Sequence, residues 1–289
     1  MRGAAPSTAN RVPLTPGRDT GFETRWNAWT EATAIGLSDH RYGLDTRNRN
    51  YTATAGLDRQ LTPDIVAGLS VGAQGGRGSG FTDLLRSSTE GFTVGPYVAM
   101  RLSDHWAIDA SFNYSQTRSD VQIVVLDGAA TLRAHSGTFD LHGQYTVDEW
   151  FLRPKLSVTY THIVSSDRLI QGSLFGLPIS FILPASQSNY GVVEGYQEFS
   201  RLFDLSNGYY AIPYIELGLH YVFDRPNGGQ ILTADLTNVI PTAWSGSVRQ
   251  GVRMQLPNAA LIEASVEYLS LGAPGLNIWE GRLRFSLGF

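Results

Sequence analysis

The chain has 289 residues, of which 42% are hydrophobic, and it carries no cysteine and a formal net charge of −4. The lack of cysteine excludes a disulfide scaffold and a zinc–thiolate site. The weak negative charge provides no basic field for nucleic acid. No apolar run is long enough for a transmembrane helix, but a transmembrane β-barrel remains possible because only alternate residues of its strands face lipid.

Residues 1–21 lack the apolar core of a signal peptide, and we expect them to be a linker or an artificial start. Pro6, Pro13 and Pro16 argue against a helix in this stretch, because proline breaks helix interiors. Twenty extended residues reach roughly 65 Å, which is enough to thread a barrel. Residues 22–289 form the single predicted domain.

Twelve segments of this domain alternate between apolar and polar residues with a period of two, which predicts β-strands. In chain order they are 22–37, 49–59, 65–75, 89–102, 106–117, 131–147, 151–163, 190–203, 210–223, 246–256, 260–270 and 277–289. In the last segment Leu283, Phe285 and Leu287 share one face, whereas Arg282 and Arg284 occupy the other. The eighth segment alternates least regularly. An even number of long antiparallel strands is typical of bacterial outer-membrane barrels.

The predicted connections differ in length at the two ends of the strands. Short turns are expected at 61–64, 103–105, 148–149, 204–208 and 257–259, and longer links at 38–48, 76–88, 118–130, 164–189, 224–245 and 271–276. Short turns on one rim and long loops on the other indicate an outer-membrane barrel rather than a soluble sandwich. Both ends of the domain then lie on the short-turn, periplasmic side.

The link at 164–189 is unusually apolar, with Leu174, Phe175, Leu177 and Phe181 among its residues. It could be a gate folded over or into the extracellular mouth. The simpler interpretation, which we favour, is that the flanking strands continue above the membrane as a β-ribbon.

Charged residues concentrate on the second face of the strands, which we predict to line a wet lumen. These lumen-facing residues are Arg153, Lys155, Glu216, Arg249, Arg253, Glu263, Glu267, Glu280, Arg282 and Arg284. Parity alone does not say which face is wet, and a soluble sandwich would place the charges outside. Strand length, loop asymmetry and the terminal phenylalanine favour the barrel. The charges could hold water and support a linker, or they could only form salt bridges along the wall.

Two tryptophans mark the predicted membrane interface. Trp106 and Trp150 each follow a short turn directly, where an amphipathic ring suits the boundary between lipid and water. The alternative is that each ring simply fills a hydrophobic sheet.

The last strand, residues 277–289, ends in phenylalanine with alternating apolar residues before it, and it resembles the closing strand of autotransporter β-domains. The segments Gly95-Pro96-Tyr97 and 152–156, and the Trp26/Trp29 pair, are similar to other parts of that family, so that the resemblance covers roughly residues 22–289. It implies that Phe285, Leu287 and Phe289 form the signal read by the barrel-assembly machinery.

The resemblance also implies a function. It suggests an outer-membrane translocator pore of type V secretion that exports an N-terminal passenger domain to the cell surface. Because the sequence contains no nucleotide-binding motif, we expect this movement to need no nucleotide. The expected partners are outer-membrane lipid, the barrel-assembly machinery and the chain's own passenger, and the expected state is a monomer. Family members usually carry a pore helix before the first strand, and the prolines of residues 1–21 leave none evident here.

Two other functions remain open from the sequence. A stand-alone, porin-like channel would share the terminal phenylalanine. An outer-membrane lipid hydrolase would need a base, for which His142, His162 and His220 are the candidates at or near strands, but no nucleophile-elbow or paired-histidine metal motif is present. The glycine-rich stretch 72–78 has no helix after it and suits a flexible strand end better than a phosphate loop. We therefore expect no catalytic, cofactor-binding or metal-binding residue.

Overall fold

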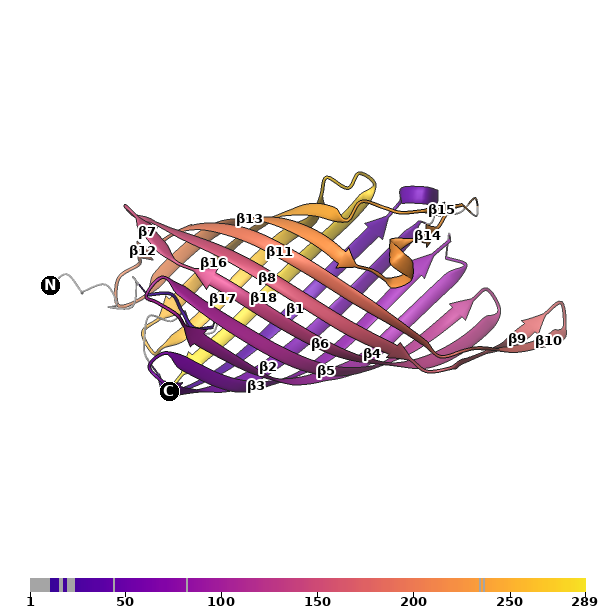
Figure 1. Ribbon diagram of the computed structural model, residues 1–289, viewed down its shortest axis with the longest axis horizontal. Coiled ribbons are helices and arrows are strands. Elements are labelled where there is room, and N and C mark those ends of the chain that lie inside the picture. The colour runs from indigo at the N-terminus through magenta and orange to yellow at the C-terminus, as the bar shows by residue number, and fades with distance from the viewer. Residues whose placement is uncertain are drawn as a thin grey trace.

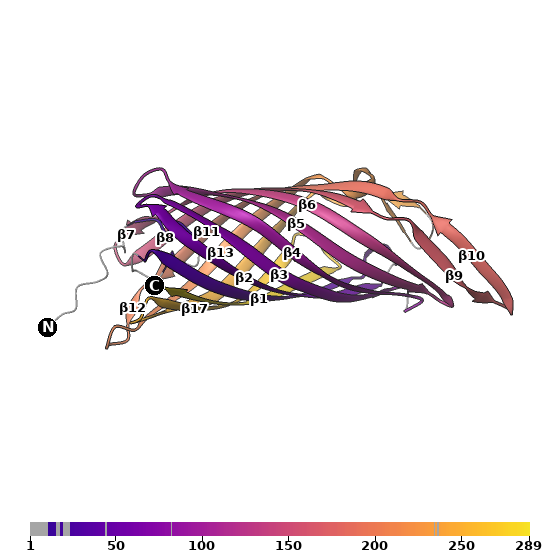
Figure 2. The same cartoon turned by 90° about the horizontal axis from the view of Figure 1, so that it is seen from below.

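Twelve long antiparallel strands form a closed, hollow barrel in the part of the chain that the computed structural model describes, namely residues 11–15, 18–19, 24–43, 45–81, 83–233, 235 and 237–289. Neighbours in sequence are neighbours in the wall, and the strands are strongly tilted (Figures 1 and 2). The barrel closes where β1 (Trp26–Asp39) pairs with β18 (Leu276–Gly288), from Asn27 opposite Gly288 to Asp39 opposite Leu276. The expected all-β barrel of twelve strands is confirmed.

The other wall strands are β2 (Thr46–Thr62), β3 (Ile65–Gly80), β4 (Leu85–Arg101), β5 (Trp106–Ile123), β6 (Leu126–Gly143), β8 (Trp150–Ser165), β11 (Ser186–Arg201), β13 (Tyr210–Asp224), β16 (Trp244–Leu256) and β17 (Ala260–Leu271). Short strands extend the rims: β7 (Tyr145–Val147), β9 (Arg168–Leu174), β10 (Leu177–Leu183), β12 (Phe203–Asp204), β14 (Ile231–Leu232) and β15 (Asn238–Val239). Two 3₁₀ turns, η2 (Arg41–Gly43) and η3 (Pro226–Gly229), lie between strands. None of the described helices is long and apolar enough to cross a membrane.

Side chains of the wall are arranged inside out relative to a soluble protein. On β13, Ile215, Leu217 and Leu219 are each about half exposed on the outer face, whereas Glu216 and His220 are buried on the inner face. The same alternation runs around the barrel, so its outer surface is apolar and its interior polar. A barrel surrounded by membrane hydrocarbon accounts for this pattern, because its outer side chains contact lipid and its closed wall leaves no backbone hydrogen-bonding group unpaired. A soluble sandwich is therefore excluded.

The strands are longer than the alternation predicted. The expected long links 38–48, 76–88, 118–130 and 271–276 shrink to residues 40–45, 81–84, 124–125 and 272–275. Above the membrane both faces of a strand meet water, so the apolar alternation stops although backbone pairing continues. The glycine-rich stretch 72–78 lies within β3 rather than at a flexible strand end. The apolar link 164–189 is the β9–β10 hairpin, which projects beyond the barrel as the favoured ribbon (Figure 1).

The weakly alternating eighth segment is a full wall strand, β11, which starts at Ser186 rather than at residue 190. Its register against β13 shifts between Gly191 and Val192. The extra residue of this bulge is Phe223 of β13, so β11 itself keeps an unbroken register against β8. Its sequence alternates poorly because the inner face mixes Glu194 and Glu198 with Val192 and Tyr196, whereas the outer face carries Gly195 and Gln197.

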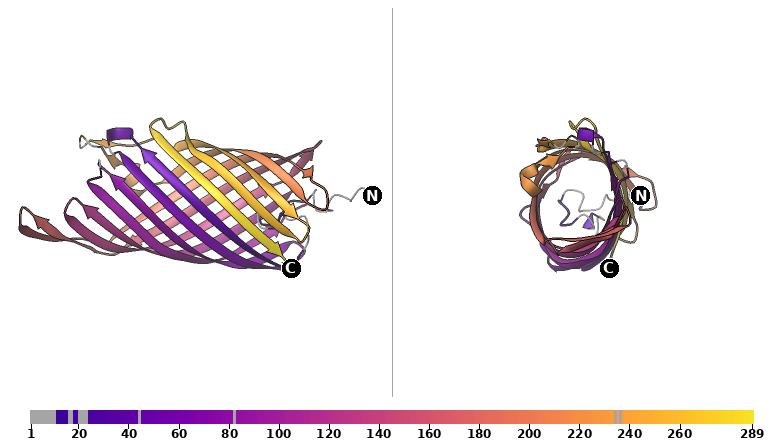
Figure 3. Two further views of the ribbon diagram at one scale, coloured as in Figure 1. Left: turned by 180° about the vertical axis from the view of Figure 1, so that it is seen from behind. Right: turned by 90° about the vertical axis from the view of Figure 1, so that its right-hand side faces the viewer.

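The described residues before β1 lie inside the barrel, at the end where the short turns and the C-terminus are found (Figure 3). Of the predicted linker 1–21, residues 1–10, 16–17 and 20–21 lie outside the described residues. The first wall strand begins at Trp26, whereas the sequence predicted residue 22, and residues 22–23 also lie outside the described part.

Candidate functional site

The inner wall of the barrel has two unlike halves. Strands β8, β11, β13, β16, β17, β18 and β1 carry most of its charged side chains. Strands β2 to β6 carry mainly small uncharged ones, although Asp58, Arg101, Asp109 and Asp140 are charged members of this half. Because both halves face the same interior, the lumen has a charged side and an uncharged side.

A continuous series of ion pairs, which we call the charge chain, crosses the charged half. Asp19 binds Arg153 (2.6 Å), which lies 3.8 Å from Glu198. Glu198 accepts two hydrogen bonds from Arg253, whose Nε lies 3.6 Å from Glu263. The chain continues through Arg284, 3.4 Å from Glu263, to Glu31 of β1. Opposite charges alternate along it, so each buried charge has a partner of opposite sign.

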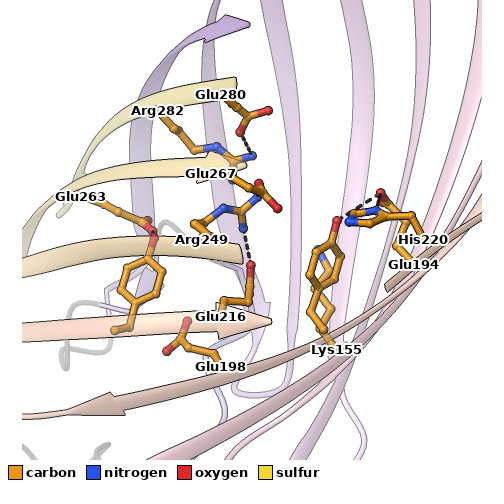
Figure 4. Close-up of polar contacts among 12 residues, drawn as sticks. Lys155, Glu194, Glu198, Glu216, His220, Arg249, Glu263, Glu267, Glu280 and Arg282 are labelled. Carbon is orange, nitrogen blue, oxygen red and sulfur yellow. Dashed lines mark hydrogen bonds and ion pairs between the residues drawn. The ribbon is translucent and has the colours of Figure 1, made fainter. Parts of the chain in front are cut away.

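Two further clusters flank the charge chain (Figure 4). Arg249 lies between Glu216 (2.5 Å) and Glu267. Arg282 donates to Glu280 at 2.7 Å and lies 3.9 Å from Glu31, which connects this cluster to the charge chain.

The structure places all ten predicted lumen residues on the inner face, and nine of them belong to the charge chain or to its flanking clusters. The tenth, Lys155, pairs with Asp140 at 2.9 Å. Glu31, Asp58, Glu194 and Glu198 also face the interior but were not among the predicted lumen residues. The shared parity of Glu194 and Glu198 within β11 is the sequence signal that could have revealed those two.

A second polar network lies near the short-turn end of β1 to β4. The Trp29 indole donates to the Tyr97 hydroxyl (2.7 Å), which donates to Asp58 (2.8 Å). Asp58 also accepts from Arg18 at 2.6 Å and is almost completely buried. The network therefore ties residues before the first strand to three strands of the wall.

Backbone contacts hold the described segment 11–15 across this end of the lumen. The Val12 amide donates to the carbonyl of Asp104 (2.9 Å), and Arg101 donates to the carbonyl of Val12 (3.3 Å). Leu14 packs against Val66 and Ala99 of the inner wall. The segment thus covers part of the short-turn mouth.

Arg11 adds an ion pair to the turn at 102–105. Its Nε lies 2.8 Å from Asp104, and this hydrogen bond lowers the pKa of the exposed Asp104 carboxyl. Both side chains are well exposed, so the pair positions the segment more than it stabilises the fold.

The uncharged half leaves open space along the lumen. A cavity of about 460 Å³ is bordered mainly by small polar residues of the wall, including Thr93, Ser111, Ser115, Ser136 and Thr161, and at its margins by Trp29, Tyr97, Asp109 and Arg284. Hydroxyl groups can donate and accept hydrogen bonds without fixed charge. We call this strip the hydroxyl lane.

The predicted terminal signal lies on the outer face of the seam. Phe285, Leu287 and Phe289 are all exposed, and Phe289 exchanges backbone hydrogen bonds with Trp26 (2.8 and 2.9 Å). Trp106 and Trp150 begin β5 and β8 at the short-turn end, on the same face as the exposed apolar residues.

No hydrolytic triad is assembled in the part of the chain that the structure describes. His220 Nδ1 lies 2.8 Å from Glu194, but His220 Nε2 and the nearby Ser247 hydroxyl are both buried without a hydrogen-bond partner. His142 binds the carbonyl of Pro13 (3.0 Å), and His162 binds Asn189 (2.7 Å). The described residues also contain no group of three or more side chains that could hold a metal ion.

Comparisons with known proteins agree with this geometry. The family model "Autotransporter beta-domain" matches residues 28–267. The chain is similar to the translocator domain of autotransporter NalP from Neisseria meningitidis, with a TM-score of 0.71, 14% identity, and coverage of 96% of this chain and 92% of that one.

It is also similar to two further solved structures. The β-domain of the Bordetella autotransporter BrkA has a TM-score of 0.67 and 17% identity, over 92% of this chain and 100% of that one. The transport unit of AIDA-I from Escherichia coli has a TM-score of 0.61 and 15% identity, over 98% and 96%. No curated protein sequence matches the chain.

Proposed function

Because the chain belongs to the autotransporter β-domain family, we propose that it forms the pore through which a passenger, joined before the barrel, reaches the cell surface. The chain is a twelve-stranded β-barrel of the bacterial outer membrane. Export of a passenger, and its attachment upstream of residue 21, are the steps that we add.

The observation that carries this proposal is the position of the described residues before β1. Residues 11–15 and 18–19 lie within the lumen and bind its inner wall through Asp19–Arg153 and Arg18–Asp58. The described chain just before β1 therefore runs inside the barrel.

The two halves of the lumen suit a moving chain. Arginines of the charged half are already paired with carboxylates of the wall or of residue 19, so they offer few free charges that would trap a passing segment. The hydroxyl lane offers weak, interchangeable hydrogen bonds beside open space. Since no nucleotide motif is present, folding outside the cell would give the movement its direction.

The test is to fuse a signal peptide and an epitope-tagged reporter upstream of residue 21. Intact cells should display the tag to added protease, and the barrel should show the heat-dependent electrophoretic mobility of a folded outer-membrane protein. An inserted barrel without surface tag would contradict the proposal.

Variants of the hydroxyl lane make the test sharper. Replacing Ser111 and Ser136 by tryptophan should narrow the lane and slow surface display by about ten-fold or more, because steric blockage acts on the passage itself. The matched control is replacement of both residues by threonine, which keeps the hydroxyls and should leave display unchanged. Equal display by the two double variants would mean that the passenger does not use this lane.

The surface-display experiment, together with two further assays, distinguishes the proposed translocator from a stand-alone channel and from a lipid hydrolase. A stand-alone channel would conduct ions in planar bilayers but would not display the tag. We propose that the pore has no catalytic activity, so His220→Gln should alter no ester cleavage by purified protein. If cleavage is found and this substitution abolishes it, the hydrolase interpretation replaces ours.

We also propose that the barrel acts as a monomer and that Phe285, Leu287 and Phe289 are its assembly signal. Their outward position at the seam leaves them accessible to another protein during insertion. Truncation of Phe289 should reduce the folded fraction in cells but not refolding from urea into detergent, which uses no assembly machinery.

A further inference from the structure

Four arginines cluster on the outer surface at the loop end of β2, β3 and β4, which lie side by side in the wall (Figure 2). They are Arg47, Arg49, Arg77 and Arg86, and all four are exposed. Each shares the parity of outward-facing apolar residues on its own strand, such as Tyr51, Val71 and Phe92. We call this group the arginine patch.

Like charges meet directly within the arginine patch. Arg49 and Arg77 are cross-strand partners, and Arg86 lies diagonally across from Arg77. Like charges directly opposite each other destabilise a sheet. Among the described residues, none of the four arginines forms an ion pair with a carboxylate. An external anion would relieve this repulsion.

Acids of the same outer face lie beside the arginine patch without pairing with it. Glu90 is diagonally across from Arg77 and Asp120 is diagonally across from Arg86, and Asp120 and Asp127 border a cavity together with these two arginines. Asp120 instead binds Arg118 at 3.2 Å, and Glu90 lies opposite Arg118 in the register. The wall therefore pairs Arg118, whereas no described carboxylate forms an ion pair with the arginine patch.

The patch lies at the level where lipid headgroups are expected. Arg49 and Arg47 follow the exposed Tyr51 toward the loop end by two and four residues, which places them about 7 and 14 Å beyond it along the strand. A cavity of about 520 Å³ lies among the four arginines and the exposed Trp279 ring, which packs against Tyr268 at 4.9 Å. Tryptophan and tyrosine are typical of the membrane interface.

We propose that the arginine patch binds the phosphate groups of a phosphorylated glycolipid of the outer leaflet, with its acyl chains along the apolar wall below. Guanidinium groups recognise phosphate through paired, charge-assisted hydrogen bonds. The apolar surface of β2 to β4 and the neighbouring Trp279 ring distinguish this ligand from free phosphate, since only a lipid contacts both surfaces. The inference is independent of passenger export.

The test compares bisphosphorylated lipid A with its dephosphorylated form, added to the full chain folded in detergent micelles. Native mass spectrometry should show about ten-fold or greater preference for the phosphorylated lipid, because only that lipid can accept charge-assisted hydrogen bonds from the guanidinium groups. The double variant Arg49→Ser/Arg77→Ser should lose that preference. The matched control, Arg118→Ser, removes an arginine from the same face and should keep it.

Three outcomes would overturn the proposal. Wild-type protein could bind both lipids equally, the double variant could keep the preference while remaining folded by electrophoretic mobility, or inorganic phosphate at equal concentration could displace the lipid completely. The melting temperature provides a second measurement that distinguishes loss of lipid binding from misfolding of the variant. Lipid A should raise the melting temperature of wild type more than that of the double variant, which without lipid should be no less stable than wild type.

Discussion

Individual glycines create the space that the interior aromatic rings occupy. A Cβ atom on Gly56 would lie 2.4 Å from the Trp29 ring, and one on Gly68 would lie 2.5 Å from the Tyr97 ring. These rings link to the buried Asp58 through two hydrogen bonds. The network therefore depends on the absence of a side chain on the neighbouring strand.

We expect Gly68→Ala to destabilise the barrel by about 1–3 kcal/mol, because the added methyl group displaces Tyr97 from a packed interior. The free energy of unfolding in urea, measured in detergent or lipid vesicles, checks this. Gly137→Ala is the control, since a Cβ at Gly137 meets no atom within 4 Å. Similar losses for both variants would show that packing at Tyr97 is not the cause.

At the scale of elements, the wall and its extensions have different roles. β9 pairs with β6 over only four residue pairs, and β10 pairs with β9 alone. Phe175 at the tip of this hairpin is 96% exposed. The barrel closes below the hairpin without it, because Ser165 of β8 faces Ser186 of β11 directly.

Replacing residues 166–185 by an Asn-Gly turn should therefore leave the barrel folded. We expect the free energy of unfolding to change by less than about 1 kcal/mol, because a two-stranded hairpin is marginally stable on its own. Heat-dependent mobility and urea unfolding measure this, and binding of a hydrophobic dye to the folded protein should fall. Loss of the folded barrel would mean that the hairpin guides β8 and β11 together.

At the scale of the whole molecule, the charge chain joins strands that are distant in the sequence. It extends from β8 through β11, β16, β17 and β18 to β1, and so across the seam that closes the barrel. Arg253 is its central member, with Glu198 and Glu263 on either side and the Tyr214 ring 4.2 Å from its guanidinium. Removal of one member leaves its partners charged and buried.

Arg253→Met should lower the free energy of unfolding by about 3–5 kcal/mol, because the buried carboxylates of Glu198 and Glu263 lose their positively charged partner. The double variant Arg253→Met/Glu198→Gln should cost less than the sum of its single variants, as a double-mutant cycle would show. Arg201→Ser is the comparison, because its pair with Glu149 is exposed at the rim and such pairs contribute at most about 1 kcal/mol. If the stability losses of the two single variants simply add in the double variant, Arg253 and Glu198 of the charge chain are not energetically coupled.

The sequence by itself determined the class of the protein, its twelve strands and, along most of them, which residues share a face. Alternation is a local property, since each side chain points to the face opposite its neighbour's. Leu283 and Arg284 are therefore assigned to opposite faces without knowledge of any other strand, although which of the two faces meets lipid is not a local property. The pattern was weakest in β11, whose inner face mixes apolar and charged residues, and above the membrane, where both faces are wet.

Only the tertiary structure decided which residues meet. Register and closure bring Glu31 of the first strand to Arg284 of the last, and they bring Asp19 to Arg153 across the lumen. Those contacts join positions far apart in the sequence, and no spacing rule encodes them. The same is true of the arginine patch, whose residues meet because neighbouring strands align one arginine against another.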